Sequence, residues 1–131
     1  MIVVIDASTA AEIVLRRDRA EELAGWVERA GLVMAPTLYV AEIGNVFWKY
    51  CKLGGLSLED GETALERALA LPDDFADDRS LCREAFMLAH KTKLTVYDML
   101  YLTLARRESG HLLTLDDKLR QAAKGEEVRV L

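Results

Sequence analysis

The sequence opens with MIVVIDAS (residues 1–8), in which four β-branched residues follow one another without a polar break and stop at Asp6. A continuous apolar run of this kind is typical of a strand that is covered on both faces, as in a parallel sheet. Two further runs, LVMA (residues 32–35) and LLTL (residues 112–115), have the same character. The sequence therefore predicts a parallel sheet built from these strands and the segments that connect them.

The connecting segments have the apolar spacing of helices. We expect helices over about residues 8–16, 19–30, 36–53, 57–69, 80–91 and 98–107, a short helix ending near residue 124, and a last strand over residues 127–130. Residues 71–75 could form a short edge strand, and the Asp-rich stretch 72–79 is interpreted as a solvated turn. Because strands alternate with helices, the sheet should be covered by helices on both sides.

Length and composition narrow the class of protein. The chain has 131 residues and a formal net charge of -5, which favours one domain and argues against binding nucleic acid through a broadly basic surface. The apolar start is too short for a signal core and lacks a basic leader, and no apolar run is long enough to cross a membrane. Cys51 and Cys82 form no CxxC motif. We therefore expect a cytoplasmic protein whose contacts with nucleic acid are local or mediated by a metal ion.

Three aspartates stand where strands end or helices begin. Asp6 follows the first strand, Asp116 follows the third, and Asp98 opens the apolar helix 98–107. A carboxylate in such a position can accept a hydrogen bond from a backbone N–H of the first helical turn. Each aspartate taken alone could therefore be a helix cap.

Glu42 does not fit the role of a cap. It lies inside LYVAEIGNVFWKY (residues 38–50), where Lys49 is the only other charged residue. Asn45 follows one turn later on the same helix face. Because a carboxylate is costly to bury without a partner, Glu42 should either pair with an Arg or Lys or share a cation with other acids.

The predicted topology brings these acids together. The carboxyl ends of parallel strands lie at one edge of the sheet, so Asp6 and Asp116 should meet there. The helices that contain Glu42 and Asp98 begin at the same edge. Four carboxylates in one cleft repel each other and raise one another's pKa, and a divalent cation relieves that repulsion.

Oxygen ligands indicate which metal would bind. Carboxylates suit Mg²⁺ or Mn²⁺ rather than zinc, and His90 and His111 do not form a zinc-binding pair. A cation of this kind lowers the pKa of water, orients a phosphate group and stabilises the leaving oxygen. The acids therefore point to metal-dependent hydrolysis of phosphodiester bonds.

Four segments carry a resemblance to a known family. They are, in order, Asp6-Ala7-Ser8, Glu42-Ile43-Gly44-Asn45, Tyr97-Asp98-Met99-Leu100-Tyr101-Leu102 and Leu113-Thr114-Leu115-Asp116. Their order resembles the signature of PIN domains, and especially that of the VapC toxins of prokaryotic toxin–antitoxin pairs. The resemblance spans essentially the whole chain.

The resemblance implies a fold, an activity and partners. The fold would be a three-layer α/β/α sandwich with a central parallel sheet of four to five strands, in a single PIN domain over residues 1–131. The activity would be that of an Mg²⁺- or Mn²⁺-dependent endoribonuclease. The partners would be the RNA substrate, a second copy of the chain, and a cognate VapB-type antitoxin that lays a peptide over the acidic pocket.

The resemblance also assigns roles to residues. The acidic metal-site positions match Asp6, Glu42, Asp98 and Asp116. Supporting polar positions match Ser8, Asn45 and Thr114, and Asp117 is an additional acid beside them.

Other residues are candidates for binding RNA or a second subunit. Phosphate contacts could come from Arg16, Lys91, Lys93 and Lys118. Tyr97 and Tyr101 could stack on bases, although tyrosines on an apolar helix are usually part of a core. The helix 36–53 has more apolar surface than one core-facing stripe needs, and this surplus predicts a homodimer interface; the residues concerned are Leu38, Tyr39, Phe47, Trp48 and Tyr50.

Two alternatives to the ribonuclease remain. The first is a catalytically silent PIN-fold module that binds RNA or protein. The second is a phosphatase in which Asp6 is the nucleophile, but that chemistry usually needs an acid two residues later, where this chain has Ser8.

Overall fold

The structure is a computed structural model that describes residues 1–131. It contains five strands, β1 (Ile2–Ile5), β2 (Leu32–Pro36), β3 (Asp74–Ala76), β4 (His111–Leu113) and β5 (Arg129–Val130). Its seven helices are α1 (Ala7–Val14), α2 (Ala20–Arg29), α3 (Leu38–Lys52), α4 (Leu58–Leu69), α5 (Asp78–Thr92), α6 (Val96–Arg107) and α7 (Asp117–Gly125). None of these helices is long and apolar enough to span a membrane.

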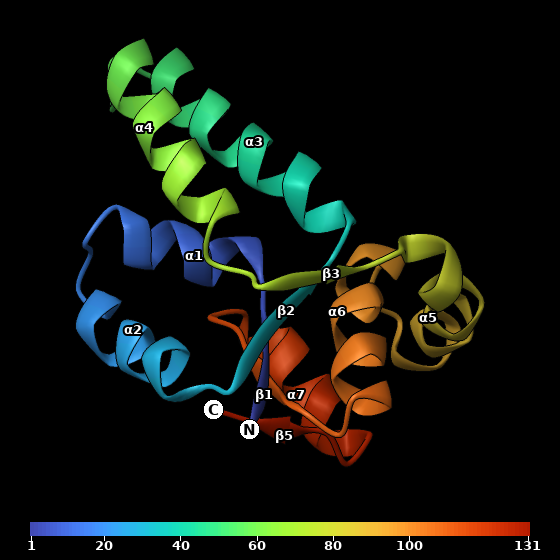
Figure 1. The fold of residues 1–131 in the computed structure, drawn as a ribbon. Coiled ribbons are helices and arrows are strands. Elements are labelled where there is room, and N and C mark those ends of the chain that lie inside the picture. The colour runs from blue at the N-terminus through green and yellow to red at the C-terminus, as the bar shows by residue number, and fades with distance from the viewer.

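The strands form one parallel sheet in the order β3-β2-β1-β4-β5. In the centre of the sheet Val4 pairs with Met34 of β2 on one side and with Leu112 of β4 on the other. Helices α1 and α2 lie on one side of the sheet, and α6, with α5 outside it, lies on the other (Figure 1). The predicted three-layer α/β/α sandwich with a parallel sheet is therefore confirmed.

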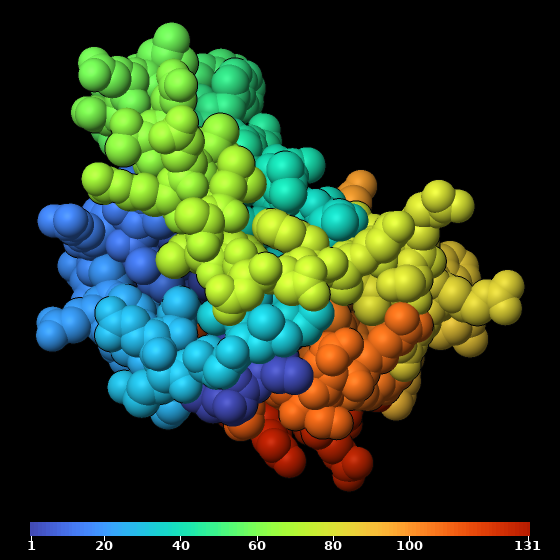
Figure 2. Space-filling view, in the orientation of Figure 1, coloured from blue at the N-terminus to red at the C-terminus, as the bar shows by residue number.

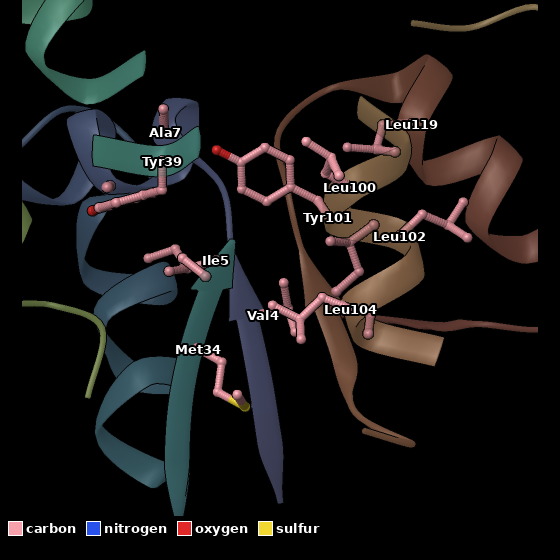
Figure 3. Packing of buried hydrophobic residues seen from close by; sticks show 14 of the residues in the cluster. Val4, Ile5, Ala7, Met34, Tyr39, Leu100, Tyr101, Leu102, Leu104 and Leu119 are labelled. Carbon is pink, nitrogen blue, oxygen red and sulfur yellow. The ribbon is translucent and has the colours of Figure 1, made fainter. Parts of the chain in front are cut away.

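The core lies where β1 and β2 pack against α6. Val3, Val4 and Ile5 are completely buried, as the unbroken apolar run predicts. From the other side, α6 contributes side chains along its whole length, among them Leu102 and Leu104 (Figure 3). This packing fixes the position of α6 relative to the carboxyl end of β1.

Helices α3 and α4 form a hairpin that projects from the body of the molecule (Figures 1 and 2). The hydroxyl of Tyr39 joins them by donating a 2.6 Å hydrogen bond to the carbonyl oxygen of Ala68. Tyr39 and Phe47 are buried in this packing, so they do not belong to the surplus apolar surface predicted for α3. Trp48, with 54% of its surface exposed, does.

Three predicted boundaries are wrong. Pro36 ends β2 instead of starting α3, because its neighbour Thr37 continues the pairing by donating from its N–H to the carbonyl of Ala76. Helix α6 begins at Val96, because Thr95 rather than Asp98 is its N-cap. The short edge strand expected over residues 71–75 is present as β3, but it lies at residues 74–76, inside the stretch interpreted as a solvated turn.

The aspartates around β3 have structural roles that the prediction of a solvated turn did not include. Asp73 accepts a 2.8 Å hydrogen bond from the N–H of Val33. Asp77 caps α5 by accepting a hydrogen bond from the N–H of Arg79. The first bond joins the segment before β3 to β2, and the second fixes the start of α5, so the Asp-rich stretch is an ordered connection.

Candidate active site

The strand order reverses beside β1, because the chain passes from β1 to β2 on one side and returns to β4 on the other. In open parallel sheets such a reversal leaves a crevice at the carboxyl ends of the strands, and this is where ligands bind. Asp6 follows β1 directly, and Thr114 follows β4. The topology therefore places both residues at this crevice.

Asp6 is almost fully buried and is held by several donors. Its Oδ1 accepts 2.9 Å hydrogen bonds from the Ser8 hydroxyl and from the N–H of Thr9, which makes Asp6 the N-cap of α1. Its Oδ2 accepts a hydrogen bond from the hydroxyl of Thr114. Burial raises the pKa of Asp6, and these hydrogen bonds oppose that rise. Asp6 can therefore cap α1 and belong to the acidic site at the same time.

Asp116 also combines two roles. Its carboxylate accepts hydrogen bonds from the N–H groups of Lys118 and Leu119, so it caps α7. Its own N–H donates a 3.0 Å hydrogen bond to the Thr114 hydroxyl oxygen. Thr114 therefore connects the carboxylate of Asp6 to the backbone of Asp116.

Glu42 reaches the crevice from α3. Its partner is Tyr101 of α6, whose hydroxyl donates a 2.6 Å hydrogen bond to Glu42 Oε1. In Figure 3 the hydroxyl of Tyr101 points away from α6, toward the side of the molecule on which Ala7 and Tyr39 lie. Glu42 makes no ion pair, so the ion-pair interpretation of this residue is wrong.

Asp98 is not used to cap its own helix. Thr95 accepts a 3.2 Å hydrogen bond from the N–H of Asp98, which leaves the Asp98 carboxylate in the first turn of α6 without a capping role. Burial raises the pKa of Asp98, a hydrogen bond with the Thr95 side chain opposes this rise, and the charges of Asp116 and Asp6 add to it. Asp98 is therefore available to bind a ligand in the crevice.

All four acids line one pocket with a volume of about 460 Å³. Its walls contain no Lys, Arg or His. Tyr101 and Leu115 form part of the wall, and the complete set of lining residues is Asp6, Ala7, Ser8, Glu42, Asn45, Val46, Asp98, Tyr101, Leu115, Asp116 and Leu119. The predicted meeting of distant carboxylates at one sheet edge is thus observed.

The carboxylates surround the pocket without converging on one point. No three acidic side chains are placed to hold a metal ion together as they stand. The hydrogen bonds described above explain this arrangement, because they fix Asp6 against Thr114 and Glu42 against Tyr101. Binding of one cation by three acids therefore requires side-chain rotation, most simply of Asp98, whose side-chain partner, Thr95, lies at the start of its own helix.

The donor set nevertheless suits a hard divalent cation. Every ionisable lining residue apart from Tyr101 is a carboxylic acid, and oxygen ligands are those that Mg²⁺ and Mn²⁺ prefer. Burial raises the pKa of Glu42, and the charges of Asp6, Asp98 and Asp78 add to this rise. The ionised forms of three acids in the pocket are therefore destabilised, and a bound cation would stabilise them.

The supporting residues predicted from the sequence fall into two groups. Ser8 and Asn45 line the pocket, and Thr114 lies buried beneath it in contact with Asp6. Asp117 lies outside the lining, exposed in the first turn of α7. The structure therefore brings three of these four residues to the site.

None of the four predicted phosphate-binding residues lines the pocket. Arg16 and Lys93 are exposed at the ends of α1 and α5. Lys91 and Lys118 border a separate groove between α5 and α7, where Lys91 forms a 2.7 Å ion pair with Glu126. Lys91 is thus partly neutralised within the protein.

Tyr101 is the site residue that sequence reasoning missed. It was assigned to the core or to base stacking, and it is indeed 98% buried, but its hydroxyl binds Glu42. Its spacing from Asp98 could have revealed this role, because residues three apart share a helix face. A tyrosine that shares a helix face with one acid of the pocket is well placed to donate a hydrogen bond to another acid of the same pocket.

Together the fold and the pocket define a class of protein: a three-layer α/β/α protein with an acidic pocket at the carboxyl edge of a parallel sheet. Residues 3–125 match the sequence model of the PIN domain. The chain belongs to the PIN domain family, and the resemblance predicted from its four motifs is confirmed.

Individual relatives agree with this assignment. The chain is 32% identical over 127 residues to Ribonuclease VapC3 of Pyrobaculum aerophilum, which covers 92% of this chain and 94% of that protein. The crystal structure of PAE2754 from the same organism superposes with a TM-score of 0.76 at 24% identity, over 95% of this chain and 90% of that one. VapBC2 from Rickettsia felis, solved bound to a DNA fragment from its promoter, gives a TM-score of 0.70 at 14% identity. This superposition covers 100% of this chain and 98% of that one.

Proposed function

We propose that this protein is an Mg²⁺- or Mn²⁺-dependent endoribonuclease and the VapC-like toxin of a type II toxin–antitoxin pair, acting as a single PIN domain over residues 1–131 in the cytoplasm. The observation that carries the proposal is the convergence of four carboxylates from separate parts of the chain on one pocket without a basic residue. The relative named as a ribonuclease supports the choice of RNA as substrate.

In this proposal Asp6, Glu42, Asp98 and Asp116 hold the cation. When bound, a divalent cation lowers the pKa of water, neutralises phosphate charge and stabilises the leaving oxygen. Asp6 is the most rigid of the four acids, because three hydrogen bonds fix its two oxygens. It therefore serves as the fixed ligand around which the others arrange.

The remaining residues position the acids and the substrate. Thr114 orients Asp6 and the backbone of Asp116 together, and Tyr101 orients Glu42. Ser8 and Asn45 offer a hydroxyl and an amide at the pocket wall that can bond RNA or water. Lys118, at the groove between α5 and α7, and the exposed Arg16 and Lys93 supply positive charge for phosphates farther along the strand. Lys91 contributes less, because it pairs with Glu126.

We also propose two protein partners. The solved structure of VapBC2 supports a VapB-like antitoxin as the first partner. We propose that this antitoxin lays a peptide over the acidic pocket. The second partner is another copy of the chain, docked through the exposed apolar residues of α3 such as Trp48. Sedimentation at high protein concentration tests this homodimer, and a monomer throughout would refute it.

The activity is tested by incubating the protein with tRNA, rRNA and mRNA in Mg²⁺, Mn²⁺ or EDTA. We expect cleavage with either cation and none in EDTA. The variants Asp6→Asn and Asp98→Asn should lose cleavage and remain folded, whereas Asp60→Asn, an exposed acid in the first turn of α4, should keep it. Full cleavage by both pocket variants would refute the assignment.

The same experiment tests the alternative of a silent binding module. Such a module would bind RNA or a basic peptide through the acidic pocket and show no turnover with any cation. A phosphatase is disfavoured by Ser8, whose hydroxyl donates to Asp6 in the place where an acid–base residue would be needed.

A further inference from the structure

A second hollow adjoins the acidic pocket along α3. It has a volume of about 350 Å³ and is lined by Val46, Lys49, Tyr50 and Leu53. Val46 lines both this hollow and the acidic pocket, so the two lie next to each other along α3. The helical repeat explains why they adjoin, because Val46 follows Glu42 by four residues, and Lys49, Tyr50 and Leu53 follow Val46 by three, four and seven.

The hollow differs from the pocket in charge. Lys49 is exposed at its edge, and the guanidinium of Arg17 lies 4.8 Å from the centre of the Tyr50 ring. No acid is among its lining residues. The change from four acids to two cations therefore occurs within about two helical turns of Glu42.

These features match single-stranded nucleic acid. A polyanion approaching four carboxylates on a chain of net charge -5 is repelled, so cations next to the pocket are needed to hold it. Proteins that bind single strands combine such cations with aromatic and apolar surfaces on which bases lie. Lys49, Arg17 and Tyr50 provide this combination, whereas a peptide that carries a basic residue into the acidic pocket would be repelled by the same cations.

We propose that this hollow is the subsite for the nucleotide adjacent to the cleaved phosphodiester bond. Its base lies against Val46, Tyr50 and Leu53, and its phosphate pairs with Lys49. Arg17 holds the Tyr50 ring in place by its cation–π contact and contributes a second positive charge. The inference rests on the proposed ribonuclease activity and adds two RNA-contacting residues, Lys49 and Tyr50, to the site.

The test compares two lysines of the same helix. Lys49→Ala and Tyr50→Ala alter the hollow, while Lys52→Ala is the matched control, because Lys52 does not line the hollow and contacts the Trp48 ring instead. Tyr50→Phe retains the ring and controls for misfolding of Tyr50→Ala, and thermal unfolding of each variant checks the fold.

Two measurements are made on every variant with fluorescent, mixed-sequence, single-stranded RNA: binding by anisotropy in EDTA over a range of salt, and steady-state cleavage in Mn²⁺. We expect Lys49→Ala to raise Kd and KM several-fold, leave kcat nearly unchanged, and reduce the slope of log Kd against log salt by about 0.7. Tyr50→Ala should raise Kd and KM roughly 5- to 100-fold, and Tyr50→Phe should match the wild type.

The outcomes separate the two claims. If the protein cleaves RNA and both hollow variants behave like the controls on α3, the subsite is refuted and the ribonuclease assignment stands. The hollow would then be a candidate surface for binding a protein partner. If no RNA is cleaved but Lys49→Ala and Tyr50→Ala still weaken binding relative to their controls, the hollow binds RNA without being a subsite of a nuclease, and the catalytic assignment fails.

Discussion

The hydroxyl of Tyr101 donates a 2.6 Å hydrogen bond to the carboxylate of Glu42, although the two residues are 59 positions apart in the sequence. The bond joins α3 to α6 across the mouth of the acidic pocket. It orients the one acid of the four that lies in the middle of a helix, and it favours the ionised form of that acid. Pocket shape and the charge state of Glu42 therefore depend on the same contact.

Replacement of Tyr101 by phenylalanine removes this contact and little else. We expect the pKa of Glu42 to rise further and the affinity for Mn²⁺ to fall about tenfold, because residues that orient metal ligands usually contribute on that scale. The free energy of unfolding should fall by about 1 kcal/mol. Cleavage rates measured against Mn²⁺ concentration test this expectation. Tyr97→Phe, at an exposed tyrosine on the same helix, is the control, and identical Mn²⁺ dependence in the two variants would contradict it.

Thr114 has a hydroxyl that serves two partners at once, Asp6 and the N–H of Asp116. Thr114→Val should destabilise the protein by about 1–3 kcal/mol, because it leaves buried groups without a hydrogen-bond partner. Thr103→Val is a matched control, since the buried Thr103 hydroxyl has no partner and its loss should be neutral or stabilising. Denaturant unfolding of both variants measures the difference, and equal effects would show that the Thr114 bonds contribute nothing.

The charge of Asp98 should destabilise the protein when no cation is bound. Its pKa is raised in the folded state above its ordinary value of 3.8. Between these two values the folded protein binds more protons than the unfolded chain, so stability falls as pH rises through this window. Asp98→Asn removes the loss and should be more stable than wild type at neutral pH, by less than about 1 kcal/mol because the group is partly exposed to solvent.

The pH dependence of that difference is the critical observation. The advantage of Asp98→Asn should shrink as pH falls through the window and disappear near pH 3.8. Thermal unfolding in EDTA at a series of pH values measures it. If the stability advantage of Asp98→Asn did not change with pH, or if this variant were less stable than the wild type at neutral pH, the pocket would not destabilise the ionised form of Asp98.

The sheet could be predicted from the sequence because its strands are buried on both faces. The unbroken runs at residues 2–5, 32–35 and 112–115 need no tertiary information to be recognised, and each contributes to a strand in the structure. Boundaries were less predictable where two capping residues compete. Thr95 and Asp98 both suit the start of α6, and in the structure Thr95 caps the helix by accepting from the N–H of Asp98 in its first turn.

The acids of the site could be predicted, but their partners could not. Asp6 and Asp116 follow strands, so topology alone brings them to one edge. The bond between Tyr101 and Glu42, the pairing of Lys91 with Glu126, and the hollow beside Lys49 all depend on how separate helices pack. A single sequence carries no local signal for such contacts, because the interacting residues are far apart along the chain.

The most direct test of the account is a titration of the metal-free protein with Mn²⁺, followed by electron paramagnetic resonance of the free ion. We expect the wild type to bind Mn²⁺ and both Asp6→Asn and Asp98→Asn to bind it at least about tenfold more weakly, while Asp60→Asn binds as the wild type does. If Asp98→Asn retained wild-type affinity, or if the wild type bound no Mn²⁺, the four carboxylates would not form a cation site and the proposed nuclease mechanism would be wrong.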